Sequence, residues 1–123
     1  MNVNDFNQDQ KQALLDLLLL GMYADHNLSS SEDQRVEQLL GTLKFSSDYE
    51  RDQFSDAAFT RARQKSDSPE AMQAYVGELA KHFPGNKLRQ EAYDILDDLL
   101  TSDGRVSSEE SKLLSTVKDV FKL

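Results

Sequence analysis

ALLDLLLLGM, residues 13 to 22, is the most apolar stretch of the chain and decides its fold. The stretch is far shorter than the ~20 apolar residues that cross a bilayer, and Asp16 interrupts it. No basic region precedes it and no small-residue cleavage site follows it, so we expect neither a membrane span nor a signal peptide. Helical spacing extends over residues 5 to 24. So wide an apolar face predicts a central helix with neighbours on several sides.

Five more helices are predicted along the rest of the chain, because prolines and glycines are few and apolar residues recur at helical spacing. Their ranges are 30–43, 48–65, 69–83, 87–101 and 108–121. Pro69 suits the first position of a helix, and Pro84 followed by Gly85 ends that helix. Six helices with short connections predict an all-α fold, a single compact helical domain over residues 1–123.

The same spacing predicts which side chains form the core. The first helix contributes a broad stripe, and each later helix contributes a narrower one. The predicted inward residues are Phe6, Ala13, Leu14, Leu15, Leu17 to Leu20, Met22, Val36, Leu39, Leu40, Leu43, Phe54, Ala58, Ala62, Met72, Tyr75, Val76, Leu79, Phe83, Leu88, Ala92, Ile95, Leu96, Leu99, Leu113, Leu114, Val117 and Phe121.

The chain is acidic, with 22 Asp and Glu against 14 Lys and Arg and a net charge of −8. So negative a surface repels phosphate backbones and anionic lipids, and we expect no nucleic-acid partner. It favours cations and basic proteins instead. The chain has no cysteine, which excludes disulfides and zinc–cysteine sites and fits a reducing compartment. We therefore expect a cytoplasmic protein.

An internal repeat relates the two ends of the chain. When the sequence is offset by 78 residues, Asp25 falls on Asp103 and Glu32 falls on Glu110. The shared pattern is a helix, then Asp-x-x-apolar-Ser-Ser-x-Glu, then a second helix. Two such units predict helix hairpins related by a pseudo-twofold axis.

Helix capping is one interpretation of the two repeated turns. Ser29 with Glu32, and Ser107 with Glu110, have the spacing of capping boxes, in which serine and glutamate side chains each bond to the other's backbone N–H. Ser47 with Glu50 forms a third pair of this kind outside the repeat. Capping explains the serines and glutamates. It explains the two aspartates less well, because they precede the turns.

Metal binding is the second interpretation. Asp103, Gly104 and Glu110 fit the back half of an EF-hand calcium loop. The front half fails, because the first ligand position falls on Leu99 in one copy and on Gly21 in the other. Neither turn alone can supply enough oxygen ligands, so a cation site would have to pool both turns. Four carboxylates packed together repel one another unless a cation neutralises them. Its ligands would be Asp25, Glu32, Asp103 and Glu110.

The two copies, LLLLGMYADHNLSSSE (17–32) and ILDDLLTSDGRVSSEE (95–110), resemble the paired ADG-x-[IV]-x-x-x-E segments of the TerB-like family of tellurite-resistance proteins. The resemblance implies an all-helical fold with two repeats about a pseudo-twofold axis. It also implies a divalent metal site, with calcium among the candidate ions, at Asp25, Glu32, Asp103 and Glu110. The chain departs from the pattern at His26, where the family usually has glycine. The family is associated with tellurite and other chemical stress.

Other polar residues are candidates for ligands or partner contacts. Asp16 lies in the leucine run, and we expect it to turn to solvent on a narrow polar face, with a ligand role as the alternative. We expect His26 to be an exposed turn residue and His82 to be a cation at the C-terminus of a helix. The segment 49–65 carries four basic residues and is expected to be the solvated face of a helix that packs Phe54 inward.

Two functions follow from these patterns. The first is a small helical module that binds a divalent cation, Ca²⁺ first and Mg²⁺ or Mn²⁺ next, in a stress or tellurite-resistance response. The alternative is a metal-free interaction domain whose acidic surface docks a basic protein partner. With two distant histidines and no cysteine, no nucleophile and base can be paired, so we do not expect an enzyme.

Overall fold

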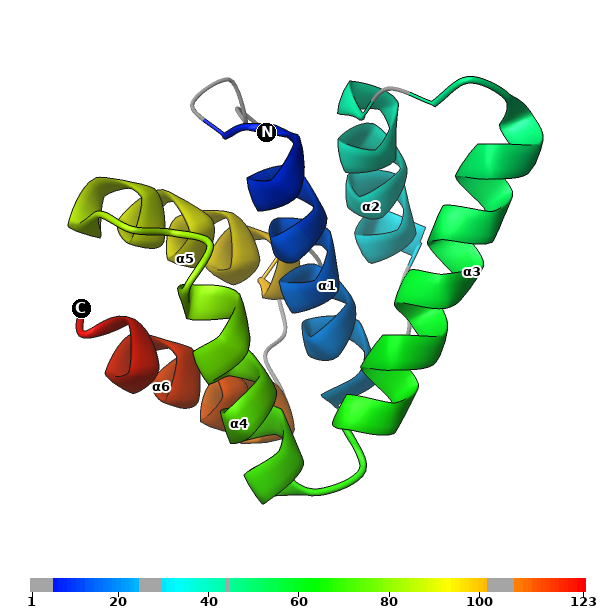
Figure 1. Cartoon of the computed structure of the whole chain (residues 1–123). Coiled ribbons are helices and arrows are strands. Elements are labelled where there is room, and N and C mark those ends of the chain that lie inside the picture. Colours follow the sequence, from blue (N-terminus) through cyan, green and yellow to red (C-terminus); the bar gives the residue numbers. More distant parts are fainter. Residues whose placement is uncertain (1–5, 25–29, 44, 102–107) are drawn as a thin grey trace.

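The structure is a computed structural model that describes residues 6–24, 30–43, 45–101 and 108–123, with the backbone alone for residues 24 and 30–33. The described residues form helices and contain no strand, so the predicted all-α fold is confirmed (Figure 1). The pseudo-twofold relation between the terminal helix pairs stays a prediction. The helices are α1 (Gln8–Ala24), α2 (Ser30–Thr42), α3 (Asp48–Lys65), α4 (Pro69–Ala80), α5 (Asn86–Leu100) and α6 (Ser108–Phe121).

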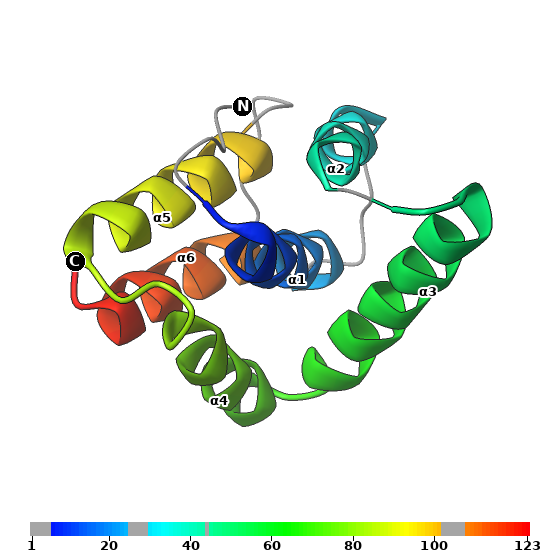
Figure 2. The same ribbon diagram turned by 45° about the horizontal axis from the view of Figure 1, so that its top comes forward.

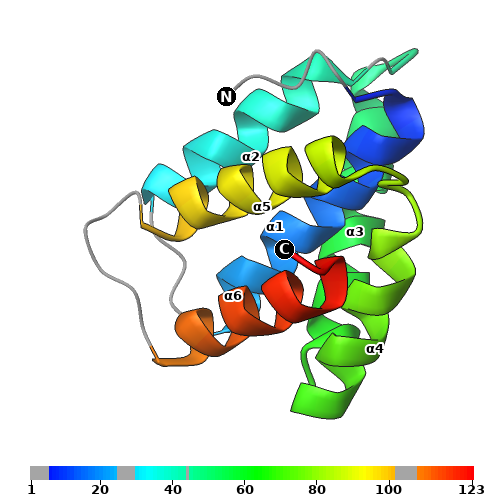
Figure 3. The same cartoon turned by 90° about the vertical axis from the view of Figure 1, so that its left-hand side faces the viewer.

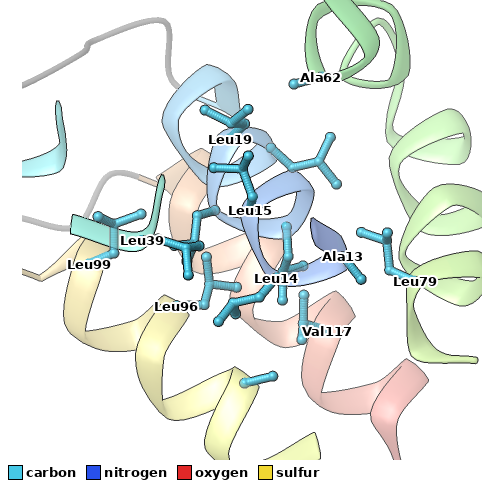
Figure 4. Close-up of a cluster of buried hydrophobic side chains, with 14 of the residues drawn as sticks. Ala13, Leu14, Leu15, Leu19, Leu39, Ala62, Leu79, Leu96, Leu99 and Val117 are labelled. Carbon is cyan, nitrogen blue, oxygen red and sulfur yellow. The ribbon is translucent and has the colours of Figure 1, made fainter. Parts of the chain in front are cut away.

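Helix α1 lies at the centre of the molecule, with the other five helices arranged around it (Figure 2). Every residue from Ala13 to Leu20 is buried, which includes both faces of the helix. The close-up in Figure 4 shows its leucines among side chains from the surrounding helices, such as Leu39 of α2, Leu79 of α4 and Leu96 of α5. The predicted central helix is therefore confirmed. Among the described residues, no helix combines the length and apolar character needed to cross a membrane.

The predicted core is largely confirmed. Phe54, Met72, Leu88, Ile95 and Leu114 are partly buried and pack against the core from its edge. The remaining predicted residues are buried, and the structure adds Ala80 and Leu100 to them. The helical repeat thus identified the inward faces, while the degree of burial at the edges depends on how the helices meet.

Two predicted helix ends lie three residues away from those in the structure, and the ends of α2 and α5 differ by one residue. Helix α1 begins at Gln8 and not at residue 5, because Asn7 and Gln10 cap it: each side chain accepts a bond from the other's backbone N–H, at 2.8 and 2.9 Å. Helix α4 ends at Ala80 and not at Phe83. Residues 81 to 83 instead form a tighter turn, in which each N–H bonds to the carbonyl three residues earlier. Helix α5 also begins one residue earlier than predicted, at Asn86.

The helix start at Pro69 is confirmed. The Ser68 hydroxyl accepts a bond from the Ala71 N–H at 3.1 Å, and Pro69 occupies the first turn. The capping box predicted at Ser47 forms only in part. Ser47 accepts the Glu50 N–H at 3.2 Å, whereas the Glu50 carboxylate bonds to Ser46 and not to Ser47.

Helix α3 packs against α1 with few buried side chains, as expected for a solvated helix. Ala58 and Ala62 are its buried residues, and their small size lets the two helices approach closely. Two aromatic pairs add contacts between α3 and its neighbours. The ring centroids of Phe54 and Phe45 are 5.3 Å apart, and those of Phe59 and Tyr23 are 6.2 Å apart. Two arginines of α3 reach acidic residues on neighbouring helices: Arg51 pairs with Glu37 of α2, and Arg61 pairs with Asp16 of α1.

Candidate functional site

Glu110 is the predicted metal ligand whose side chain the structure describes. It lies in the first turn of α6 and is 3% exposed, while the adjacent Glu109 is exposed. The N-terminal end of a helix stabilises a negative charge, but burial removes the hydration of that charge. Asp25 and Asp103 lie outside the described residues. Glu32 lies in α2, but its side chain is outside them as well.

Several residues of the proposed helix caps also lie outside the part of the chain that the structure describes. Ser29, Ser107 and His26 all lie outside the described residues. Helices α2 and α6 do begin at equivalent positions of the repeat, Ser30 and Ser108. Both interpretations of the turns therefore stay open at the level of their side-chain contacts.

The ends of α1 and α5, which lead into the two turns, pack against each other at Gly21. A Cβ atom at Gly21 would lie 2.9 Å from Cδ2 of Leu100 and 3.1 Å from Cδ1 of Leu96. Both leucines are fully buried and have little room to move. Glycine is therefore what allows the two helices to approach this closely. In the sequence, Asp25 follows Gly21 by four residues and Asp103 follows Leu100 by three.

A second contact joins the hairpins on the same side of the molecule. Arg35 of α2 donates to Asp98 of α5 at 2.5 Å. Figure 3 shows that the ends of α1 and α5 and the starts of α2 and α6 lie toward one side. Within the described part of the chain, however, no three acidic or histidine side chains gather closely enough to hold a metal ion. The pooled site therefore stays a prediction.

Asp16 overturns an expectation, because it does not turn to solvent. It is 8% exposed and lies on the side of α1 that faces Arg61 of α3 and Tyr75 of α4. Tyr75 of α4 donates its hydroxyl to Oδ2 at 2.6 Å, and Arg61 of α3 donates to Oδ1 at 3.1 Å and to Oδ2 at 3.4 Å. A buried carboxylate inside a leucine run thus accepts hydrogen bonds from a phenol and a guanidinium of two other helices.

The contacts of Asp16 shift the pKa values of both partners. Burial, with the hydrogen bond to Asp16 and its negative charge, raises the pKa of Tyr75 from 10.0 to about 12. Partial burial lowers the pKa of Arg61, but the hydrogen bonds and charges of Asp16 and Tyr75 together outweigh that effect and raise the pKa above its ordinary value. Both partners therefore keep their protons, and their hydrogen bonds to Asp16, at neutral pH.

The Tyr75 shift predicts a loss of stability at high pH. Because the folded protein holds the phenol proton more tightly than the unfolded chain does, the contribution is complete below pH 10 and is lost as pH rises toward 12. Urea unfolding across this interval should show a steeper decline for the wild type than for Tyr75→Phe. The phenolate absorbance of the folded wild type should also show one late-ionising tyrosine that the variant lacks. Identical declines for the two proteins would contradict the shift.

The Asp16 cluster forms one wall of a surface groove, the α1–α3–α4 groove, with a volume of about 460 Å³. Helix α1 contributes Asp9, Gln12, Ala13 and Asp16. Phe54 and Arg61 come from α3, and Tyr75, Glu78, Leu79 and His82 come from α4 and the turn after it. The residues of α1 and α4 each follow the spacing i, i+3, i+4, i+7, so one face of each helix lines the groove.

Sequence reasoning missed Arg61 and Tyr75 as partners of Asp16. A signal was present, because a carboxylate inside a fully apolar run must be paired if it is buried. Arg61 also directly precedes Ala62, one of the small residues that bring α3 against α1. His82 is exposed beyond the end of α4, where its side chain faces the groove.

The comparisons with known proteins agree with the resemblance seen in the two repeats. No curated protein and no solved structure gives a significant match. The family model described as "Tellurite resistance protein TerB" matches residues 11–123. The match begins at residue 11, in the first turn of the central helix α1, and includes both acidic turns, the Asp16 cluster and every other helix. The chain therefore belongs to the TerB tellurite-resistance family.

Proposed function

We propose that this chain is a TerB-family module that binds a divalent cation through its two acidic turns, within a stress or tellurite-resistance response. The ligands would be Asp25, Glu32, Asp103 and Glu110. The observation that carries the proposal is the burial of Glu110 in the first turn of α6. A carboxylate in such a place suits an inward-facing ligand, because a cation would offset the hydration that burial removes.

The packing of the flanking helices supports a pooled site. The close approach at Gly21 brings together the two helices that precede the turns, and the Arg35–Asp98 pair joins α2 to α5. Short turns leaving neighbouring helix ends on one side of the molecule can bring their acidic residues to a common ion. Carboxylate oxygens are hard ligands, so the order of preference is Ca²⁺, then Mg²⁺ or Mn²⁺.

Thermal unfolding with Ca²⁺ and with EDTA tests the proposal. A ligand at one hundred times its Kd stabilises a fold by about 2.7 kcal/mol, which for a domain of this size raises Tm by roughly 10 °C. The wild type should show this rise. An Asp25→Asn/Asp103→Asn variant should lose it, because asparagine keeps the shape and much of the hydrogen bonding but removes the charge.

Adjacent glutamates in α6 provide a matched pair of variants. Glu110→Gln should reduce the Ca²⁺-dependent rise, whereas Glu109→Gln, which changes the exposed neighbour in the same helical turn, should retain it. The comparison is between the rises with and without Ca²⁺, so any cost of losing a helix cap cancels. Unchanged midpoints with millimolar Ca²⁺, Mg²⁺ or Mn²⁺ would reject metal binding, as would equal rises for the two variants.

A further inference from the structure

We propose that the α1–α3–α4 groove binds an arginine or lysine side chain of a partner protein. Asp9 and Glu78 would pair with the cationic head, and Ala13, Leu79 and Phe54 would contact its apolar stem. The proposal is independent of the acidic turns, because none of these residues belongs to them.

The groove has the shape and lining for a long basic side chain. Its volume of about 460 Å³ exceeds what one such side chain needs and leaves room for the adjoining backbone of a peptide. Ala13 and Leu79 are buried, so they form an apolar floor, while Asp9 and Glu78 are exposed at the rim. Lysine and arginine suit this arrangement because their stems cover apolar surface while their heads stay at the polar edge.

The charges around the groove leave two carboxylates available for an incoming cation. Arg61 and Tyr75 both bond to Asp16, so the guanidinium charge of Arg61 is already matched inside the groove. Among the described residues, neither Asp9 nor Glu78 forms an ion pair. The lining carries three carboxylates and one guanidinium, so carboxylates are in excess there. Charge complementarity therefore selects a basic partner.

The chain's own cations already make contacts of this kind beside the groove. Arg61 crosses from α3 to Asp16, and the Lys65 ammonium lies over the Tyr75 ring, 5.6 Å from its centroid. A metal ion fits the groove less well, because no three acidic or histidine side chains within the described residues converge on one point. A lysine or arginine side chain needs no such convergence, because its stem contacts apolar surface while its head pairs with a carboxylate at the rim.

Nuclear magnetic resonance titration of the 123-residue chain with two capped tripeptides tests the proposal. One peptide carries a central arginine and the other carries citrulline, a neutral side chain of nearly the same shape. The arginine peptide should shift the backbone amides of residues 9–16 and 75–82, and its affinity should exceed that of the citrulline peptide by ~tenfold. High salt should weaken the arginine peptide selectively.

Two double variants of equal net charge complete the experiment. Asp9→Asn/Glu78→Gln should weaken binding of the arginine peptide by ~tenfold. Asp56→Asn/Asp119→Asn removes two exposed carboxylates outside the groove and should leave the affinity unchanged. The proposal fails if millimolar arginine peptide shifts no groove amide, if citrulline binds equally well, or if both double variants weaken binding alike. Metal-dependent unfolding is measured separately, so either proposal can fail without the other.

Discussion

Replacing Phe83 by alanine should lower the free energy of unfolding by about 3–5 kcal/mol. Phe83 is fully buried in the turn after α4 and contacts two other buried rings. Its centroid lies 5.7 Å from Phe6, in an edge-to-face arrangement, and 5.9 Å from Phe121 of α6. Truncation would therefore remove a large apolar side chain and two aromatic contacts, and would leave a cavity where the N-terminal segment, α4 and α6 meet.

Urea unfolding measures this effect. A domain of this size is stable by about 5–15 kcal/mol, so Phe83→Ala could remove much of the total. Phe83→Leu, which keeps most of the apolar volume, should cost about 1–2 kcal/mol and remains measurable if the alanine variant unfolds. Tyr49→Ala provides the exposed aromatic control, because Tyr49 is 71% exposed. A cost for Phe83→Ala no greater than that for Tyr49→Ala would contradict the three-ring contact.

Replacing Arg61 by methionine should lower the free energy of unfolding by about 2 kcal/mol, the second-largest cost we expect from truncating a single side chain. Removing one member of a fully buried ion pair costs about 3–5 kcal/mol, because the other charge is left uncompensated. The Arg61 side chain is 41% exposed, so water can partly replace it, and the cost should fall below that range. Asp16 would retain the Tyr75 hydrogen bond. Methionine keeps the apolar stem, so the loss reports the guanidinium and not the packing of α3.

Two further variants separate the ion pair from general effects on α3. Arg63→Met changes an exposed arginine two residues away and should cost less than about 0.5 kcal/mol. The triple variant Asp16→Leu/Arg61→Met/Tyr75→Phe removes all three polar groups together, and it should recover most of the stability lost in Arg61→Met. The costs of Asp16→Leu and Tyr75→Phe, measured separately, provide the comparison. If the triple variant is less stable than Arg61→Met by the sum of these two costs, Asp16 is not coupled to its partners as the geometry indicates.

The fold was predictable because the helical repeat of apolar residues is strong in this chain. The buried run from Ala13 to Leu20 has no polar face wide enough for solvent, and that alone places its helix in the centre. Helix ends were harder, because side-chain caps decide them. The bonds between Asn7 and Gln10 start α1 later than the apolar pattern suggests, and the tight turn before Phe83 ends α4 earlier.

The candidate sites were less predictable, because they depend on which helices meet. Nothing in the local sequence of Asp16 specifies a guanidinium 45 residues away or a phenol 59 residues away. The α1–α3–α4 groove likewise exists only once three helices pack. The burial of Glu110 next to an exposed glutamate follows from the orientation of α6, and two adjacent acids in a sequence do not reveal which one turns inward.

The central position of α1 has a consequence for how the protein is made. Helix α1 precedes every helix that surrounds it, so its leucines are synthesised before the helices that cover them. Val117 and Phe121, which complete the core, are synthesised nearly a hundred residues later. The leucines of α1 therefore lack part of their native cover until late in translation, and such transiently exposed apolar surface favours aggregation of a growing chain. Native folding must wait until α6 has emerged.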